Sequence, residues 1–192
     1  MARDGSHYDA FVEDRKRRLF RGLTGILVEI GAGTGPNLRH LPPGLTVVAV
    51  EPNPFMHRHF LREARNGGPP AALLHGRAEA LPFRDGSIDA VLSTLVLCSV
   101  PETDRALREI LRILRPGGKF LFMEHVAAPE GSWLRRAQAL VRPVWRVLGD
   151  GCEPDRNTEG HLLRAGFREV QVERFAVPIP IVSPHIAGLA VK

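Results

Sequence analysis

Lysine and cysteine are both scarce in this chain of 192 residues. Lysine occurs only at positions 16, 119 and 192, so arginine supplies almost all of the positive charge. The two cysteines, Cys98 and Cys152, lie far apart and lack the short spacing of a zinc motif, so we predict no metal site. So few cysteines also suit a reducing compartment better than a disulfide-rich secreted fold.

Long apolar runs are missing as well. No stretch reaches the length of a membrane-spanning helix, and the first six residues are polar, without the apolar middle of a signal peptide. We therefore expect a soluble, cytoplasmic protein that is a monomer or a homodimer. The net charge of +5 is modest and the arginines are scattered, which favours a solvated surface over a nucleic-acid interface. Several arginines between residues 132 and 148 leave a peripheral membrane contact open.

Apolar strands and helical segments alternate along most of the chain. Strands are predicted at residues 26–30, 46–50, 72–75, 88–93 and 119–126. Helices are predicted between them, at residues 36–41, 54–65 and 101–115. This alternation is typical of βαβ units and a parallel sheet. We expect a single α/β domain over residues 1–192, with an N-terminal helical segment at 1–24.

The pattern changes after the fifth strand. Helices are predicted at residues 132–148 and 157–165, with Leu134, Val144 and Leu148 among the apolar positions expected to face inward on the first of them. Two further strands are predicted near residues 170–175 and 186–191. We expect residues 127–166 to form a lid or insertion over the acceptor site of an enzyme.

The segment joining the first two strands is the most informative part of the chain. The first strand runs into a turn containing Gly31, Gly33 and Gly35, and the second strand ends at Glu51. Glycine permits positive φ and lets a ligand approach the backbone closely. A carboxylate at the tip of the second strand is suited to accept hydrogen bonds from both hydroxyls of a ribose. The sequence therefore predicts a nucleotide or nucleoside site.

Two details separate this turn from a dinucleotide site. Dinucleotide folds carry G-x-G-x-x-G, whereas here the glycines follow G-x-G-x-G and Pro36 occupies the sixth position. Glu29, two residues before the first glycine, is suited to hold an ammonium group and not a pyrophosphate. A dehydrogenase loop or an ordinary strand-to-helix turn remains the alternative interpretation.

Four motifs in order resemble the class I S-adenosylmethionine (SAM) methyltransferase superfamily. They are residues 29–35, Glu51, residues 78–83 and residues 114–118. The resemblance implies a Rossmann-like, mostly parallel sheet of seven strands in the order 3-2-1-4-5-7-6, with strand seven antiparallel and helices on both faces. It also implies SAM as cofactor and S-adenosylhomocysteine as its product.

A narrower resemblance, to the methyltransferase-like 7 family, covers most of the chain. It is carried by residues 94–100, 124–126, 131–133, 149–152 and 184–192. Animal members of that family are thiol S-methyltransferases with an N-terminal membrane anchor. Since this sequence starts without such a segment, we expect a soluble, bacterial-type member.

Motif positions imply the contacts to the cofactor. Glu29 would hold the methionine ammonium, Asn37 at a helix start would meet the methionine carboxylate, and Glu51 would bind the ribose. Ala78 and Glu79 would border the adenine, and Leu95 would pass beneath the methionine portion. The full predicted set is Glu29, Gly31, Gly33, Asn37, Glu51, Pro52, Ala78, Glu79 and Leu95.

The favoured acceptor is a small-molecule thiol. A free thiol with a pKa of about 8.5 is largely protonated at neutral pH, so a nearby base or positive potential would help to form the thiolate. His125 and Asp150 are the predicted catalytic residues, although a packed histidine and a turn-forming aspartate are equally open interpretations. The alternatives are a quinone or natural-product C- or O-methyltransferase, a phospholipid-amine N-methyltransferase, and an inactive SAM-binding protein.

Overall fold

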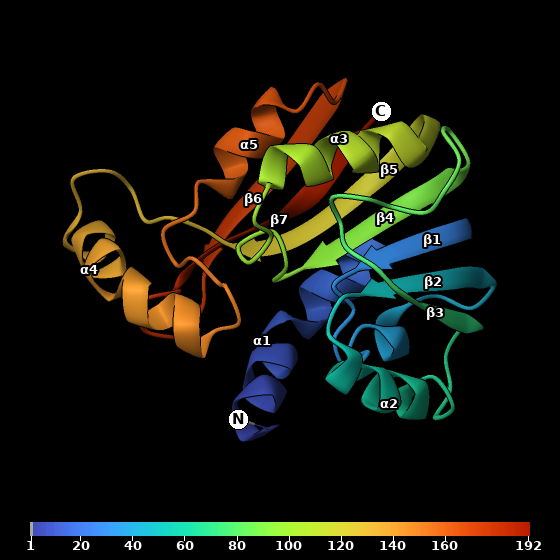
Figure 1. Ribbon diagram of the computed structural model, residues 1–192, viewed down its shortest axis with the longest axis horizontal. Helices are drawn as coiled ribbons and strands as arrows, with labels where there is room; N and C mark the ends of the chain where they lie inside the picture. The colour runs from blue at the N-terminus through green and yellow to red at the C-terminus, as the bar shows by residue number, and fades with distance from the viewer. Residues whose placement is uncertain (1) are drawn as a thin grey trace.

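Seven strands form one sheet in the computed structural model, which describes residues 2–192, with side chains described from residue 7 onward (Figure 1). Residue 1 of the predicted N-terminal segment lies outside the described residues. The strands are β1 (Gly25–Ile30), β2 (Leu45–Glu51), β3 (Ala71–His75), β4 (Ile88–Thr94), β5 (Leu114–His125), β6 (Glu169–Ala176) and β7 (Pro184–Val191).

The strand order is β3-β2-β1-β4-β5-β7-β6, as the resemblance implies. β1 pairs in parallel with both β2 and β4, whereas β7 is antiparallel to β5 and β6. β2 and β3 therefore extend the sheet on one side of β1, whereas β4 and the later strands extend it on the other, so the strand order reverses between β1 and β4. Ligands of open α/β sheets bind at such a reversal, beyond the carboxyl ends of the strands.

Helices cover both faces of the sheet. They are α1 (Ala2–Phe20), α2 (Pro54–Glu63), α3 (Thr103–Ile113), α4 (Trp133–Leu148) and α5 (Thr158–Arg164). Figure 1 shows α3 and α5 on one side of the sheet and α1 and α2 on the other. Each side has its own apolar core: Leu107, Ile110 and Leu162 pack on one face, and Phe20 and Phe60 on the other. No helix within residues 2–192 is long and apolar enough to cross a membrane.

Most predicted boundaries are off by one or two residues, and two predicted elements differ for a clear physical reason. The helix predicted at 36–41 is only a 3-10 turn, η1 (Leu38–His40). Prolines at both ends leave too few residues to form the first turns of an α-helix. β5 begins at Leu114 instead of 119, because Leu114 pairs with Ile88 before a register shift in the β4–β5 ladder.

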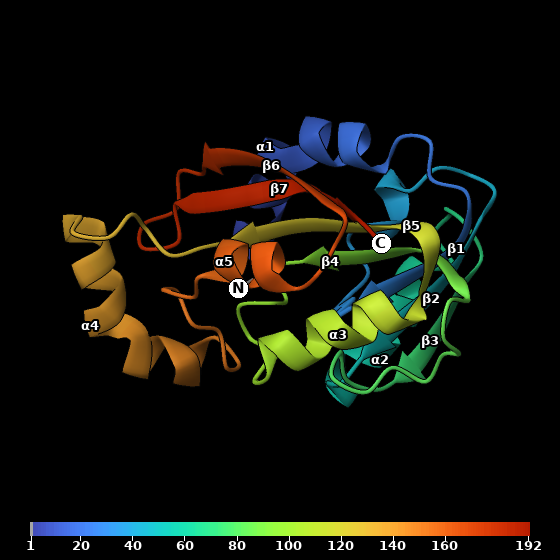
Figure 2. The same ribbon diagram turned by 90° about the horizontal axis from the view of Figure 1, so that it is seen from above.

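Helix α4 stands apart from the rest of the molecule, beyond the carboxyl ends of β4 and β5 (Figures 1 and 2). Gln138 is its buried residue, accepting from Ala128 N at 2.8 Å and donating to Ile181 O at 2.8 Å. Val144 and Leu148 are 64 % and 71 % exposed, so their predicted inward orientation is wrong. The helix extends past the sheet, which leaves apolar side chains on its outer face uncovered.

Candidate functional site

The glycine turn after β1 has the backbone conformation that its sequence predicts. Gly31, Gly33 and Gly35 all have positive φ, at 58°, 56° and 85°. A Cβ on Gly31 would lie 2.6 Å from the side chain of Val96, so that glycine allows close packing of the turn against the loop after β4. A Cβ on Gly33 would meet no described atom within 4 Å, so the backbone there borders open space.

Glu51 ties the end of β2 to this turn. Its Oε2 accepts a hydrogen bond from Gly33 N at 2.8 Å, and its Oε1 accepts from Asn53 N at 2.8 Å. The predicted residue Pro52 lies between Glu51 and Asn53 in the chain. The carboxylate is thus fixed at the carboxyl edge of the sheet beside the glycine turn, where a ribose-binding residue is expected.

Glu29 lies in the buried interior behind the turn, with 1 % of its surface exposed. Its Oε1 accepts from Asn37 Nδ2 at 2.7 Å, and the same amide nitrogen lies 3.1 Å from Thr94 Oγ1. Burial raises the pKa of Glu29 to about 7. Within the described residues, Glu29 Oε2 and Asn37 Oδ1 have no hydrogen-bond partner. Two buried acceptor oxygens without a donor fit a ligand that brings a donor, such as an ammonium group.

Asn37 is predicted at the start of a helix, and its structural environment differs from that prediction. It precedes a single 3-10 turn, and its side chain makes no capping hydrogen bond there. The amide points to Glu29 instead of a helix terminus. Its expected role toward the methionine carboxylate stays a prediction, and the helix start invoked for it is absent from the described structure.

Helix α1 brings a buried lysine toward this region. Lys16 is 2 % exposed and forms an ion pair with Asp9, which also pairs with Arg39. His40 Nε2 lies 3.3 Å from the same Asp9 carboxylate. Burial lowers the pKa of Lys16 to about 8, while the negative charge of Glu29 acts in the opposite direction. Sequence reasoning missed this cluster because Lys16 stands among arginines on what looks like a solvated helix.

The predicted adenine border is only partly exposed. Ala78 is 7 % exposed and belongs to the same apolar core as Val50 at the end of β2. Glu79 is half-buried, in a loop closed by a bridge between Arg77 and Ala80. These positions put the loop after β3 near the end of β2, and their contact with adenine stays a prediction.

Leu95 follows β4 in a left-handed conformation, with φ of 58°. Glu124, fully buried on β5, holds the residues that follow it. Its carboxylate accepts from Ser93 Oγ at 2.5 Å and from the backbone nitrogens of Val96 and Leu97 at 2.9 Å and 3.1 Å. Burial raises the pKa of Glu124 to about 7. No role was assigned to Glu124 from the sequence. A carboxylate near the end of an otherwise apolar strand was the signal that could have identified it.

His125 ends β5 and lies beside both cysteines. Its Nε2 is 3.0 Å from Cys152 Sγ, and Cys152 Sγ is 3.6 Å from Cys98 Sγ. The hydrogen bond with the Cys98 thiol and the neighbouring His125 lower the pKa of Cys152, whereas that same thiol contact and burial raise the pKa of Cys98. The cysteines are 54 positions apart in sequence, so spacing gave no sign of this cluster.

Asp150, the other predicted catalytic residue, occupies the turn after α4. It is exposed and has a positive φ of 51°, a conformation that aspartate tolerates better than most residues. This geometry is that of a turn-forming residue. Its predicted part in catalysis is not tested by these contacts and stays a prediction.

A cavity of about 340 Å³ adjoins the histidine side of the site. Its lining is mostly apolar and comprises His7, Tyr8, Phe11, Val177, Pro178, Ile179 and Pro180. The ring of Tyr8 is 5.5 Å from that of His185, which in turn is 6.2 Å from that of His125. The rings of Tyr8, His185 and His125 therefore form a row from the cavity lining to the cysteine–histidine cluster.

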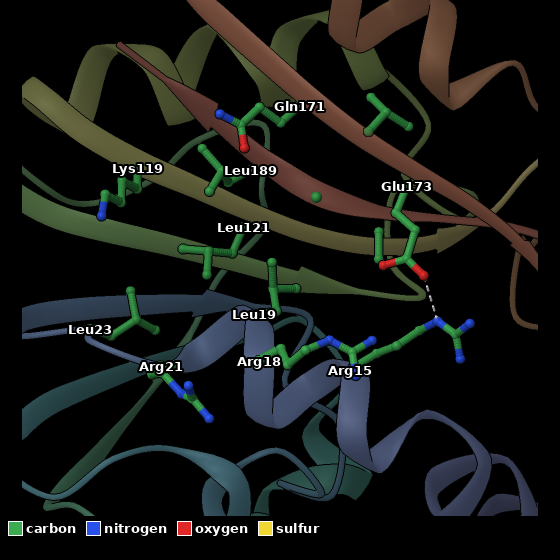
Figure 3. A pocket seen from close by; sticks show the side chains of 13 residues that line it. Arg15, Arg18, Leu19, Arg21, Leu23, Lys119, Leu121, Gln171, Glu173 and Leu189 are labelled. Carbon is green, nitrogen blue, oxygen red and sulfur yellow. Dashed lines mark hydrogen bonds and ion pairs between the residues drawn. The ribbon is translucent and has the colours of Figure 1, made fainter.

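A larger groove of about 440 Å³ runs between α1 and the strands β5, β7 and β6 (Figure 3). The Arg15–Glu173 ion pair, with an N–O distance of 3.0 Å, crosses it. The groove contacts β5 near the middle of the strand, at Lys119 and Leu121. The groove thus lies away from the carboxyl edge that holds Glu51 and His125, and we assign it no part in the site.

Comparison with known proteins gives two kinds of match. A family model described as a methyltransferase domain matches residues 28–122. The human protein thiol S-methyltransferase TMT1B is 41 % identical over 94 % of this chain and 80 % of its own length. Human thiol S-methyltransferase TMT1A is 37 % identical over 96 % of this chain and 81 % of its own length.

Solved structures agree on the fold. A SAM-dependent methyltransferase from Thermotoga maritima superposes with a TM-score of 0.65 at 23 % identity, covering 99 % of this chain and 97 % of its own. At this identity the similarity shows a shared architecture and not a shared substrate.

Proposed function

This chain belongs to the thiol S-methyltransferase family of class I SAM-dependent methyltransferases, and from that membership we propose that it methylates the sulfur of a small-molecule thiol. The observation that carries the proposal is the similarity to the two human enzymes, which extends over nearly the whole chain. It includes the strand ends on the cofactor side as well as the segments around His125 and Cys152.

The residues on the cofactor side fit SAM. When bound, SAM supplies an electrophilic methyl carbon on a sulfonium. Glu29 and Asn37 would receive its ammonium group with the two acceptor oxygens that lack protein donors within the described residues, in place of the carboxylate contact expected for Asn37 from its motif position. Glu51 would accept from the ribose hydroxyls, and the open backbone at Gly33 would lie against the ligand. The remaining predicted contacts, Gly31, Pro52, Ala78, Glu79 and Leu95, would complete the border of the site.

The protein's main task in such a transfer is alignment. A well-oriented pair of reactants gains up to about 7–11 kcal/mol over free encounter, so no covalent nucleophile is needed. Glu124 holds the backbone of the loop after β4, which fixes one wall of the site. Helix α4 and the rest of residues 127–166 would limit the access of water.

On the acceptor side, we propose His125 as the residue that promotes ionisation of the acceptor thiol, with Asp150 as the second candidate. His125 is 4 % exposed at the carboxyl end of β5, whereas Asp150 is on the surface. The mostly apolar cavity lined by Tyr8, Phe11 and residues 177–180 supports a small lipophilic acceptor.

A matched panel of acceptors tests the proposal. The purified chain is incubated with SAM and either an aromatic thiol or the phenol of the same shape, and methylated product and S-adenosylhomocysteine are measured by mass spectrometry. We expect a thioether from the thiol and at least about tenfold less ether from the phenol, since the thiol ionises more readily. Quinols and amines complete the panel.

Three results bear on the assignment. Methylation of the phenol, quinol or amine without any thioether would favour one of the other small-molecule methyltransferases. Binding of SAM without any methylated product would indicate an inactive SAM-binding protein. Loss of thioether formation in Glu51→Ala, with the fold retained, is the control that ties the product to this cofactor site.

A further inference from the structure

Cys98, His125 and Cys152 come from three separate segments and meet at the carboxyl edge of the sheet. Cys98 lies in the loop after β4, His125 ends β5, and Cys152 follows α4. One ligand atom from each, a nitrogen or a sulfur, lies within 4.8 Å of the other two. Each of these side chains is a common ligand of transition metals.

The distances match a tetrahedral thiolate site. Two Zn–S bonds of about 2.3 Å at a tetrahedral angle separate their sulfurs by about 3.8 Å. The Cys98 and Cys152 sulfurs are 3.6 Å apart. The Nε2 of His125 lies 3.0 Å from Cys152 Sγ, against about 3.6 Å for a zinc-bound pair, so a small side-chain rotation would bring these two atoms to that spacing.

The surroundings also suit a bound cation. Cys98 and His125 are 1 % and 4 % exposed, and Cys152 is partly exposed, so two of the three ligands are shielded from solvent. His125 Nε2 is the ring nitrogen that faces Cys152 Sγ, and Nδ1 has no hydrogen-bond partner within the described residues.

Only three such ligands are present. Among the side chains of residues 7–192, no fourth cysteine, histidine or carboxylate joins the group. Structural zinc sites have four protein ligands, whereas catalytic sites have three and leave the fourth position to water or substrate. The number of ligands therefore indicates an open coordination position.

We propose that Cys98, His125 and Cys152 bind one Zn²⁺ ion, and that an acceptor thiol occupies its fourth coordination position. The metal site stands on the geometry alone, and the thiol ligand rests on the proposed function. His125 then promotes ionisation of the acceptor as a ligand of the ion and not as a free base, and the acceptor loses its proton to solvent on binding Zn²⁺. Its sulfur then donates an electron pair to the methyl carbon of SAM while the carbon–sulfonium bond breaks. The products are a neutral thioether, which binds Zn²⁺ weakly, and S-adenosylhomocysteine.

Metal binding is tested first, without any turnover. The full chain is stripped with a chelator, reduced and dialysed against Zn²⁺ alone or Co²⁺ alone, and metal content is measured. We expect one ion per chain and, for Co²⁺, the visible absorption of a tetrahedral thiolate complex. His125→Gln and Cys152→Ser should weaken affinity beyond the ~10–100-fold typical of outer-shell changes, because each removes a direct ligand.

The matched control is His161→Gln, which removes a histidine that pairs with Asp104 on α3 and lies outside the cluster. It should bind metal like the unmodified chain. Cys98 is buried, so the metal affinity of Cys98→Ser is interpreted only if thermal melting shows that the variant is folded. A folded, reduced chain that binds neither ion stoichiometrically, or whose ligand variants bind as the control does, overturns the metal site.

The open position is tested on the Co²⁺-loaded protein. Adding an acceptor thiol should shift the visible spectrum, and adding the corresponding thioether should not. An unchanged spectrum at saturating thiol overturns the substrate-ligand half of the proposal. Failure of the proposed function can be distinguished from failure of the metal site. In that case the protein would bind the metal and show the spectral shift with thiol, but no thioether would form from SAM.

Discussion

Replacing Glu29 with glutamine should stabilise the protein and at the same time weaken SAM binding. Burial raises the pKa of Glu29 from 4.5 to about 7. The folded state therefore binds a proton more tightly than the unfolded state, and stability is lost as pH rises from about 4.5 to about 7. At about 1.36 kcal/mol per pKa unit, ionisation of Glu29 lowers the free energy of unfolding at pH 8 by roughly 3 kcal/mol relative to its value at low pH. About half of this decrease or less is present at pH 5.5.

Glu29→Gln removes this penalty because the amide is neutral at every pH. The substituted side chain keeps an oxygen for Asn37 Nδ2, so the existing hydrogen bond survives. In urea denaturation we expect the variant to be more stable than the unmodified chain by roughly 1–3 kcal/mol at pH 8, with a smaller difference at pH 5.5. Loss of the charged contact to the ligand ammonium should weaken SAM binding by about 10–100-fold in calorimetry.

Glu124→Gln is the matched control for Glu29→Gln. Burial raises its pKa to about 7 as well, but its carboxylate already accepts from Ser93, Val96 and Leu97. An amide group there faces backbone donors, so this variant should be less stable than the unmodified chain by about 1–3 kcal/mol. Unchanged SAM affinity in Glu29→Gln, or a loss of stability at pH 8 as large as that of the control, would refute the reasoning.

Three further predictions concern the same edge of the sheet. Glu51→Ala should weaken binding of SAM and S-adenosylhomocysteine at least about tenfold in calorimetry, since a charged hydrogen bond contributes about 1.5–3 kcal/mol, and the unmodified chain should not bind NAD. Gly31→Ala should lower the melting temperature more than Gly33→Ala, because the added Cβ lies 2.6 Å from Val96 only in the first; equal losses would contradict this. Leu95→Gly should raise the free energy of unfolding, measured in urea, by up to about 1 kcal/mol. Glycine adopts the backbone φ of 58° without strain, and the leucine side chain that is lost is 38 % exposed.

Much of the fold could be predicted from the sequence because local signals and sheet topology agree. Alternating strands and helices require parallel βαβ units, and the resemblance to methyltransferases supplied the strand order that the structure has. Asn53 and Ser132 cap α2 and α4 with their side chains, as their residue types favour. The glycine turn and Glu51 lie together because parallel strands bring their carboxyl ends to one edge.

The features that could not be predicted depend on contacts between distant segments. The cluster of Cys98, His125 and Cys152 arises only when the loops after β4 and α4 meet at the end of β5. Exposure of Val144 and Leu148 on α4 could not be predicted, because an apolar pattern does not reveal whether a partner surface is present. Proline at both ends shortened the predicted helix at 36–41 to one turn.

The ion cluster of Asp9 and Lys16 has a practical consequence for anyone shortening this protein. Helix α1 lies outside the alternating strands and helices of the sheet, yet it carries Lys16, whose positive charge lowers the pKa of Glu29. A version beginning near residue 21 would strip Arg39 and His40 of their shared counter-ion and remove the apolar cover that Phe20 gives the sheet. Expression trials of a minimal catalytic domain should therefore retain residues 9–20.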